Sequence, residues 1–386
     1  MSSYYVKADK FVLPGFVQGP GYLEISDGAF GFFSAEAPAE GAEILDCSGC
    51  WITPGFVDTH IHGFFGHDVM DCDPAGVNAS SLELARHGTT SWTPTTLTAS
   101  LEQTRAACAS VYEAVSERDE SFMGARVQAI FLEGPFFAEK YKGAQNPIYM
   151  VDPSVDAFCI WQEAAHGLIS RSALAPERAG SLEYIAELAS MGVACALGHS
   201  DATYDEGRAA IAAGANSFVH TYNAMSPLHH RNGGLVGCAM TAPTAISEII
   251  CDGKHVSPGA IEALVRAKGW DYVALITDCL ACGGLADGDY FLGELPIELH
   301  DGAAYLQGTN TLAGSTATLA AEVKNVVDWG IVTAEQAIRM ASEVPARMSL
   351  TDDVCGQIRP GRDADFNVLA ADLTLKQTYL GGRLVE

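Results

Sequence analysis

Basic residues are scarce in this chain of 386 residues, which has 22 Lys and Arg against 48 Asp and Glu and a net charge of −26 at pH 7. A surface this acidic repels the phosphates of nucleic acids and the headgroups of anionic membranes. We therefore exclude nucleic acid and membrane as general partners. An anionic small molecule would need a local cationic pocket to overcome the overall charge.

Long apolar runs are also missing, since none reaches the ~20 residues that cross a bilayer. The first residues, MSSYYVKADKFVLPG, lack the basic-then-apolar pattern of a signal peptide. The eleven cysteines are odd in number and scattered, which indicates reduced thiols. Cys47-x-x-Cys50 and Cys279-x-x-Cys282 are too far apart for a zinc ribbon, so we interpret them as packing residues. We expect a cytoplasmic protein.

Repeats and low-complexity segments are absent, while apolar residues make up 48% of the chain and allow a sizeable core. Both ends have short strand-like segments separated by turns, at 22–25, 29–33, 365–370 and 374–379. We therefore expect residues 1–53 and 351–386 to form one small β-sandwich domain. Residues 54–350 would form a second domain.

The middle of the chain alternates apolar strands with amphipathic helices. The expected strands are 51–57, 89–94, 127–132, 168–173, 193–197, 217–219, 246–250 and 273–277, and the expected helices are 74–86, 101–118, 155–166, 182–191, 204–213, 258–267, 316–329 and 333–341. Eight such units predict an α/β fold, a closed parallel (β/α)8 barrel. An open doubly wound sheet would need a glycine-rich phosphate turn after the first strand, which this chain lacks.

Candidate metal ligands follow several of the expected strands. They are His60 and His62 after the first strand, Glu133 after the third, His199 after the fifth, His220 after the sixth and Asp278 after the eighth. Barrel active sites are built at this C-terminal rim. A lone histidine is more often a packing residue than a ligand. The coincidence of strand end, residue type and order nevertheless favours a zinc or iron site.

Several motifs together resemble a known family. Residues 54–63, PGFVDTHIHG, resemble the first-strand signature of the amidohydrolase superfamily. The segments LEGPF at 132–136, GHS at 198–200, HTYNAM at 220–225, DGKH at 252–255, TD at 277–278 and LAGS at 312–315 resemble the N-acetylglucosamine-6-phosphate deacetylase family. The resemblance extends to PGRDAD at 360–365 and so covers most of the chain.

The resemblance implies a (β/α)8 barrel with a small β-sandwich formed by both termini, usually as a homodimer. It implies hydrolysis of an amino-sugar 6-phosphate to acetate and the free amine. Glu133, His199 and His220 match the family's metal ligands, and Asp278 matches its catalytic aspartate. The residues that match its sugar-phosphate contacts are Ala144, Gln145, Asn223, Ala224, Arg231, His255, Leu312, Ala313 and Gly314, with Arg231 expected in the site of the neighbouring subunit.

Two positions vary within the family. Some members lack the first-strand histidine pair, so His60 and His62 imply room for a second ion here. We expect one or two divalent ions, with zinc first and iron or another divalent ion as the alternative. Gln145 stands where some members have a histidine thought to polarise the acetyl carbonyl, and it carries no charge, which shifts polarisation towards the metal.

Three alternatives stay open at this point. The first is the same reaction on N-acetylgalactosamine 6-phosphate. The second is a cyclic-amide hydrolase, which would usually carry a carboxylated lysine after a middle strand, whereas here Glu133 offers the bridging carboxylate. The third is a metal-free scaffold relative, which would typically have lost ligands that this chain retains.

Overall fold

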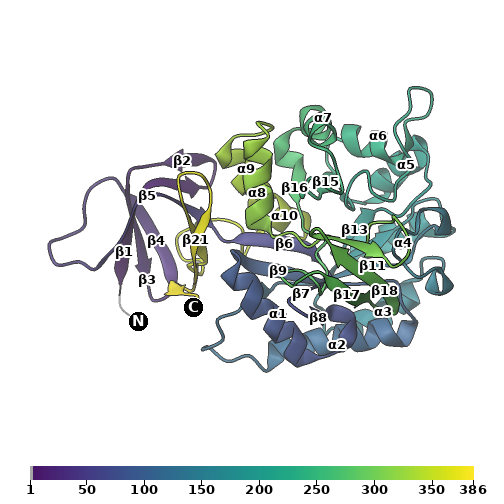
Figure 1. Cartoon of the computed structure of the whole chain (residues 1–386), viewed down its shortest axis with the longest axis horizontal. Coiled ribbons are helices and arrows are strands. Elements are labelled where there is room, and N and C mark those ends of the chain that lie inside the picture. The colour runs from purple at the N-terminus through teal and green to yellow at the C-terminus, as the bar shows by residue number, and fades with distance from the viewer. Residues whose placement is uncertain (1–2) are drawn as a thin grey trace.

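The computed structural model describes residues 3–386, and it contains two large sheets of different kinds (Figure 1). Residues 1 and 2 of the expected terminal domain lie outside the described residues. The terminal sheet lies beside the barrel, with both chain ends close together in it (Figure 1). Among residues 3–386, no helix combines the length and the apolar character needed to cross a membrane.

The terminal sheet is mostly antiparallel and draws on both ends of the chain. In β3 the side chains of Leu23 and Ile25 are buried and alternate with partly exposed ones, as expected when one face of a sheet meets a core. Its strands are β1 (Tyr4–Leu13), β2 (Phe16–Gln18), β3 (Gly21–Ser26), β4 (Ala29–Ser34), β5 (Ile44–Pro54), β20 (Phe366–Leu369), β21 (Leu375–Leu380) and β22 (Arg383–Leu384).

The second sheet is a parallel eight-stranded barrel, which confirms the predicted fold class. Its strands, in spatial and chain order, are β6 (Phe56–Ile61), β9 (Thr89–Thr96), β11 (Ile130–Phe136), β12 (Ile169–Leu174), β13 (Ala194–Leu197), β14 (Ser217–Phe218), β15 (Ile246–Ile249) and β16 (Val273–Leu275). The barrel closes where Ile61 forms a bridge with Cys279 and the Asp278 amide donates to the His60 carbonyl at 2.9 Å.

Helices connect the strands of the barrel and pack around it (Figure 1). The helix expected at 333–341 begins with a capping box, in which Thr333 Oγ1 accepts from the Gln336 amide and the Gln336 side chain accepts from the Thr333 amide. The helices are α1 (Pro74–Arg86), α2 (Leu101–Ser116), α3 (Val155–Ala164), α4 (Ser181–Ser190), α5 (Tyr204–Ala213), α6 (Gly234–Thr241), α7 (Pro258–Lys268), α8 (Leu319–Asp328), α9 (Ala334–Met340) and α10 (Glu343–Met348).

The structure differs from the sequence-based expectation in several places. The expected strand 127–132 is interrupted, with β10 (Arg126–Val127) separate from β11. The expected strand 51–57 divides at Gly55, so that β5 joins the terminal sheet and β6 opens the barrel. Helices α6 and α10 were not expected, because α6 is rich in glycine and α10 contains Pro345. A small antiparallel sheet also follows the last barrel strand, formed by β17 (Gly288–Leu292), β18 (Leu295–His300) and β19 (Ala303–Leu306).

Candidate active site

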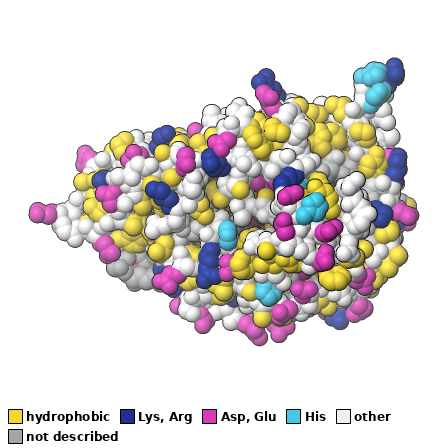
Figure 2. Space-filling model, viewed as in Figure 1, with side chains coloured by type: hydrophobic (Ala, Val, Ile, Leu, Met, Phe, Trp, Pro, Cys, Tyr) yellow, Lys and Arg dark blue, Asp and Glu magenta, His cyan; other side chains and the backbone are white. Residues whose placement is uncertain are grey.

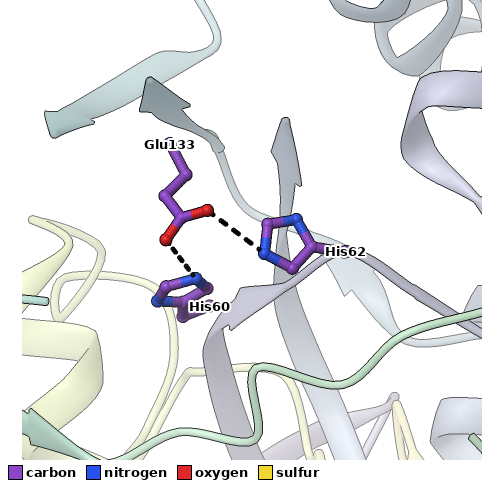
Figure 3. A group of neighbouring side chains, drawn as sticks. All are labelled: His60, His62 and Glu133. Atoms are coloured by element: carbon purple, nitrogen blue, oxygen red, sulfur yellow. Dashed lines mark ion pairs between the residues drawn. The ribbon is translucent and has the colours of Figure 1, made fainter. Parts of the chain in front are cut away.

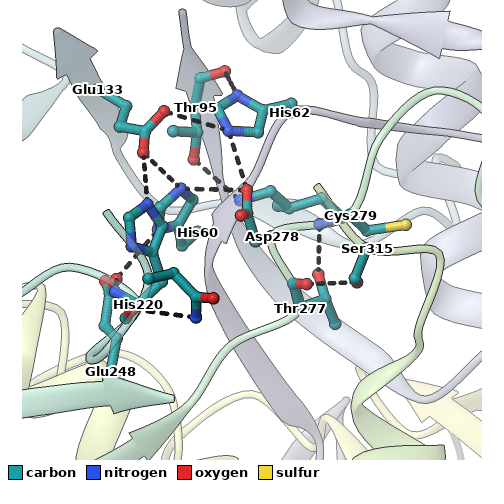
Figure 4. A network of polar contacts seen from close by, with 12 residues as sticks. His60, His62, Thr95, Glu133, His220, Glu248, Thr277, Asp278, Cys279 and Ser315 are labelled. Atoms are coloured by element: carbon teal, nitrogen blue, oxygen red, sulfur yellow. Dashed lines mark hydrogen bonds and ion pairs between the residues drawn. The ribbon is translucent and has the colours of Figure 1, made fainter. Parts of the chain in front are cut away.

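The six predicted metal-site residues lie together at one end of the barrel, and Figure 4 labels all of them except His199. His60 is the last residue but one of β6, Glu133 lies within β11, and each of the other four lies one to three residues after a barrel strand. All six side chains are buried, at 8% relative exposure or less. The six residues are His60, His62, Glu133, His199, His220 and Asp278. The barrel fold thus brings residues that are distant in the sequence into one compact group of nitrogen and oxygen ligands.

Three of these residues have left-handed backbone conformations. The φ angles are 46° for His199, 25° for His220 and 49° for Asp278. Non-glycine residues seldom adopt positive φ, and such strain is found most often at functional sites. In each case the turn comes just after a barrel strand, where the chain changes direction and its side chain faces the barrel mouth.

The first ligand group consists of Glu133, His199 and His220. The Nε2 atoms of the two histidines lie 3.1 Å apart, and each lies 3.2 Å from Glu133 Oε1. A tetrahedral zinc ion with bonds of about 2.0–2.1 Å separates its ligand atoms by roughly 3.3 Å. The three atoms therefore fit around a single ion.

The second ligand group consists of His60, His62 and Glu133 (Figure 3). His60 Nε2 lies 3.5 Å from Glu133 Oε1, and His62 Nε2 lies 3.4 Å from Glu133 Oε2. Asp278 Oδ1 is close to both rings, 3.4 Å from His60 Nε2 and 3.1 Å from His62 Nε2. Glu133 belongs to both groups, so its carboxylate can bridge two ions.

The far side of three rings is occupied by hydrogen-bond acceptors. The Nδ1 atoms face Glu248 Oε2 for His60, the Thr95 carbonyl for His62 and the Tyr141 carbonyl for His199, at 3.0, 3.2 and 2.9 Å. An Nδ1–H that donates to such an acceptor leaves the Nε2 lone pair for a metal. The buried Nε2 of His60 has no hydrogen-bond partner among the described residues, which also fits a metal ligand.

The carboxyl groups of the site favour the ionised form. Burial opposes ionisation of Glu133, but hydrogen bonds from the surrounding histidines lower its pKa well below its usual range. Burial likewise opposes ionisation of Asp278, yet His60 and His62 lower its pKa. Ionised carboxylates are the form that binds divalent cations.

A buried ion pair lies behind the histidines, and the sequence reasoning did not identify it. Glu248 Oε1 accepts from Arg171 Nη2 at 2.7 Å, and both residues are fully buried. Glu248 Oε2 faces His60 Nδ1 and also accepts from the His220 amide at 3.1 Å. The only sequence signal is a charged residue inside each of two apolar strands, β12 and β15.

A cavity of about 330 Å³ opens above the ligand groups. Thirteen of the fifteen predicted site residues line it, and the exceptions are His60, which is fully buried beneath it, and Arg231. Arg231 lies on an exposed loop and does not contact the cavity. Lys140, which was not predicted, is the one Lys or Arg among the described lining residues, and it pairs with Asp201 at 2.7 Å.

Two predicted contact residues are held by hydrogen bonds at the cavity wall. His255 Nδ1 lies 2.7 Å from Asp252 Oδ2, and its Nε2 lies 3.3 Å from the Ala313 carbonyl. Gln145 donates through Nε2 to Glu133 Oε2 and accepts at Oε1 from the Thr98 amide at 2.8 Å. Gln145 is therefore fixed beside the bridging carboxylate.

Acidic side chains are spread over the visible surface, with few basic ones between them (Figure 2). The cavity differs from this surface, because its walls combine histidines, Lys140 and amide donors with the carboxylates. It can bind metal cations at its base and a polar molecule of sugar size above them.

Residues 51–385 match the profile of the Amidohydrolase family. The chain is 38% identical over 334 residues to an N-acetylglucosamine-6-phosphate deacetylase from Vibrio furnissii, covering 86% of this chain and 82% of that protein. It is 37% identical over 335 residues to an N-acetylgalactosamine-6-phosphate deacetylase from Escherichia coli O157:H7, covering 87% and 88%.

A solved structure shares the fold over the whole chain. It is a mutant N-acetyl-D-glucosamine-6-phosphate deacetylase from Mycobacterium smegmatis in complex with N-acetyl-D-glucosamine-6-phosphate. The TM-score is 0.93 at 32% identity, with 100% of both chains covered.

Proposed function

This chain belongs to the amidohydrolase family, and we propose that it hydrolyses the N-acetyl group of N-acetylglucosamine 6-phosphate to glucosamine 6-phosphate and acetate. The observation that carries the proposal is the convergence of four histidines on Glu133, with Asp278 beside them, at the base of a cavity. An acetamide is a poor electrophile and water is a poor nucleophile. A metal site with a carboxylate beside it can activate both reactants.

We propose that Glu133, His199 and His220 hold one divalent ion, and that His60 and His62 hold a second together with Glu133. Zinc is the expected metal and iron or another divalent ion the alternative, because the ligands are imidazoles and carboxylates. When bound, such ions polarise a carbonyl and lower the pKa of the attacking water to about 7. A carboxylate in the bridging place also argues against the cyclic-amide alternative, since neither ligand group among the described residues includes a lysine.

Asp278 is the proposed general base and acid. It lines the cavity next to both ligand groups, where an attacking water would stand. Its carboxylate takes a proton from the water and then gives it to the amine nitrogen as the C–N bond breaks. The second transfer matters as much as the first, because an amine anion is not a viable leaving group.

The remaining wall residues would orient the sugar phosphate. Asn223 and the backbone of residues 312–314 offer amide groups to the sugar. His255 would donate its Nε2–H to the phosphate in place of the Ala313 carbonyl. Arg231 has a planar guanidinium suited to phosphate. Because it lies on an exposed loop outside the cavity, we propose that it acts in the neighbouring subunit of a homodimer. The eleven free cysteines support a cytoplasmic location.

The galactosamine epimer is a second candidate substrate, because the two relatives named above are nearly equal in identity to this chain. Acetate release from the two amino-sugar 6-phosphates, compared at equal enzyme concentration, tests the proposal. We expect a higher kcat/KM for the gluco epimer. A higher value for the galacto epimer would reassign the substrate, and no release from either would reject the proposed reaction.

A further inference from the structure

A second cavity of about 220 Å³ adjoins the catalytic one. The two share four lining residues, Leu97, Ala144, Gln145 and Leu292. We call the second cavity the side chamber. Beyond the shared wall it is lined by residues that do not reach the catalytic cavity, among them Met70, Asp71, Ala99, Tyr149, Glu294 and Leu295.

The shared wall stands next to the reacting centre. Gln145 donates directly to Glu133 Oε2, the carboxylate common to both ligand groups, so the scissile carbonyl must lie close to Gln145. Asn223, His255 and residues 312–314, the proposed sugar contacts, line only the catalytic cavity. The acyl group of a bound substrate is therefore the part nearest the side chamber.

We propose that the side chamber receives the alkyl chain of N-acyl groups longer than acetyl, so that the enzyme also hydrolyses N-propionyl and N-butyryl amino-sugar 6-phosphates. This inference rests on the proposed deacetylase function. The reaction balances as the parent hydrolysis does. The C–N bond breaks, the hydroxyl of water joins the acyl carbon, and the remaining proton goes to the amine.

The size and chemistry of the chamber suit a short neutral chain. An apolar cavity of about 150 Å³ holds a benzene molecule. The side chamber, at about 220 Å³, is larger, and polar residues such as Ser100, Gln103 and Asn146 line it beside the apolar ones. Leu97 and Leu292 line both cavities and are both buried and apolar, so an alkyl chain that extends from one cavity to the other would lie against apolar side chains. Gln145 also lines both cavities, and hydrogen bonds at both ends of its amide hold its side chain in place.

The charge of the chamber predicts which acyl groups it rejects. Among its described lining residues, Asp71 and Glu294 are acidic and none is Lys, Arg or His. A carboxylate at the end of the chain would meet like charge and lose its water without a cation to replace it. The enzyme should therefore hydrolyse N-butyryl but not N-succinyl glucosamine 6-phosphate.

The test compares initial rates on glucosamine 6-phosphate carrying acetyl, propionyl, butyryl or succinyl groups, for three proteins. These are the wild type, Ala99→Leu, which fills the side chamber only, and Ala106→Leu, a control in α2 that lines neither cavity. Ala99→Val is the milder variant if Ala99→Leu does not fold, and retained acetyl hydrolysis reports folding.

We expect Ala99→Leu to lower kcat/KM for the butyryl substrate by at least about tenfold, the low end of what a methylene misfit causes in an apolar pocket. Its acetyl activity and both activities of Ala106→Leu should stay near wild type.

The outcomes separate this inference from the function on which it rests. If the metal-loaded wild type does not hydrolyse even the acetyl substrate, the proposed function fails. If it hydrolyses acetyl but not butyryl, only the side-chamber proposal is wrong. Butyryl hydrolysis that is unaffected by Ala99→Leu, or succinyl hydrolysis equal to butyryl, would also overturn the proposal.

Discussion

Glu248 joins Arg171 to His60, with one carboxylate oxygen 2.7 Å from Arg171 Nη2 and the other 3.0 Å from His60 Nδ1. The pair lies across the inside of the barrel, because Arg171 belongs to β12 and Glu248 to β15. Burial opposes ionisation of Glu248, but Arg171 and His60 outweigh it and lower its pKa to about 2. A permanent negative charge thus stands behind a proposed metal ligand.

The first prediction is that Glu248→Gln weakens metal binding. Loss of such an outer carboxylate typically lowers metal affinity by about 10–100-fold. Metal affinity is measured by competition with a chelator. Because the substitution also removes the ion-pair partner of Arg171 and so lowers stability, the measurement is made well below the unfolding temperature of the variant. Glu322→Gln is the matched control, because Glu322 is equally buried but bonds to the Cys251 amide and to no site histidine. Equal affinities in all three proteins would show that Glu248 does not position His60.

The second prediction concerns Asp278→Asn, which keeps the shape of the side chain and removes the proton acceptor. General acid–base groups contribute about 10²–10⁴-fold, so kcat should fall by that factor or more. Metal content at the Glu133, His199 and His220 group should persist, while that near His60 and His62 weakens if Asp278 is also a ligand. Near-normal turnover with the metal intact would remove Asp278 as the base.

The third prediction concerns Arg231. Arg231→Ala should raise KM for the 6-phosphate far more than for the unphosphorylated sugar, because one charge-assisted bond is worth roughly 1.5–3 kcal/mol. Mixed dimers of Arg231→Ala and Asp278→Asn subunits test whether Arg231 acts on the neighbouring site. If it does, one site of each mixed dimer has both residues and activity recovers. Equal losses on both sugars would show that Arg231 does not bind phosphate.

The fourth prediction concerns Glu322 and pH. Burial, with Asp252 nearby, raises the pKa of Glu322 well above its usual range. The folded chain therefore keeps a proton that the unfolded chain releases above about pH 4.5, so stability declines with rising pH until the folded pKa is reached. Glu322→Gln cannot titrate at this position. As pH rises, the free energy of unfolding of the variant should therefore increase relative to that of the wild type, by up to about 1.4 kcal/mol per pH unit. Urea denaturation across pH 5–9 checks this, with exposed Glu187→Gln as the control. A constant difference would contradict it.

Much of the barrel could be predicted because its signals are local. Apolar runs predicted eight barrel strands, and the helix expected at 333–341 begins after the capping residue Thr333. Strand ends in a parallel barrel meet at one rim, so the order of histidines and acids was enough to bring six residues together. The division of the chain into residues 1–53 with 351–386 and residues 54–350 stays a prediction, as do the individual roles of the site residues.

Other features depend on contacts that no local pattern carries. Arg171 and Glu248 lie on strands separated by two others, β13 and β14, so their pairing requires the closed barrel. The sheet β17–β19 was missed because it interrupts the βα alternation. The side chamber depends on Leu292 of β17 meeting Leu97 after β9, again a contact between distant segments.

Metal reconstitution decides whether hydrolysis depends on an ion held by the Glu133 ligand groups. The protein is stripped with a chelator and titrated with zinc or iron, while bound metal and acetate release from N-acetylglucosamine 6-phosphate are measured on the same samples. The account predicts negligible release from the stripped protein and recovery in proportion to the first ion bound, with His199→Ala binding less metal and recovering little. Full activity in the stripped protein, confirmed metal-free by elemental analysis, would contradict it.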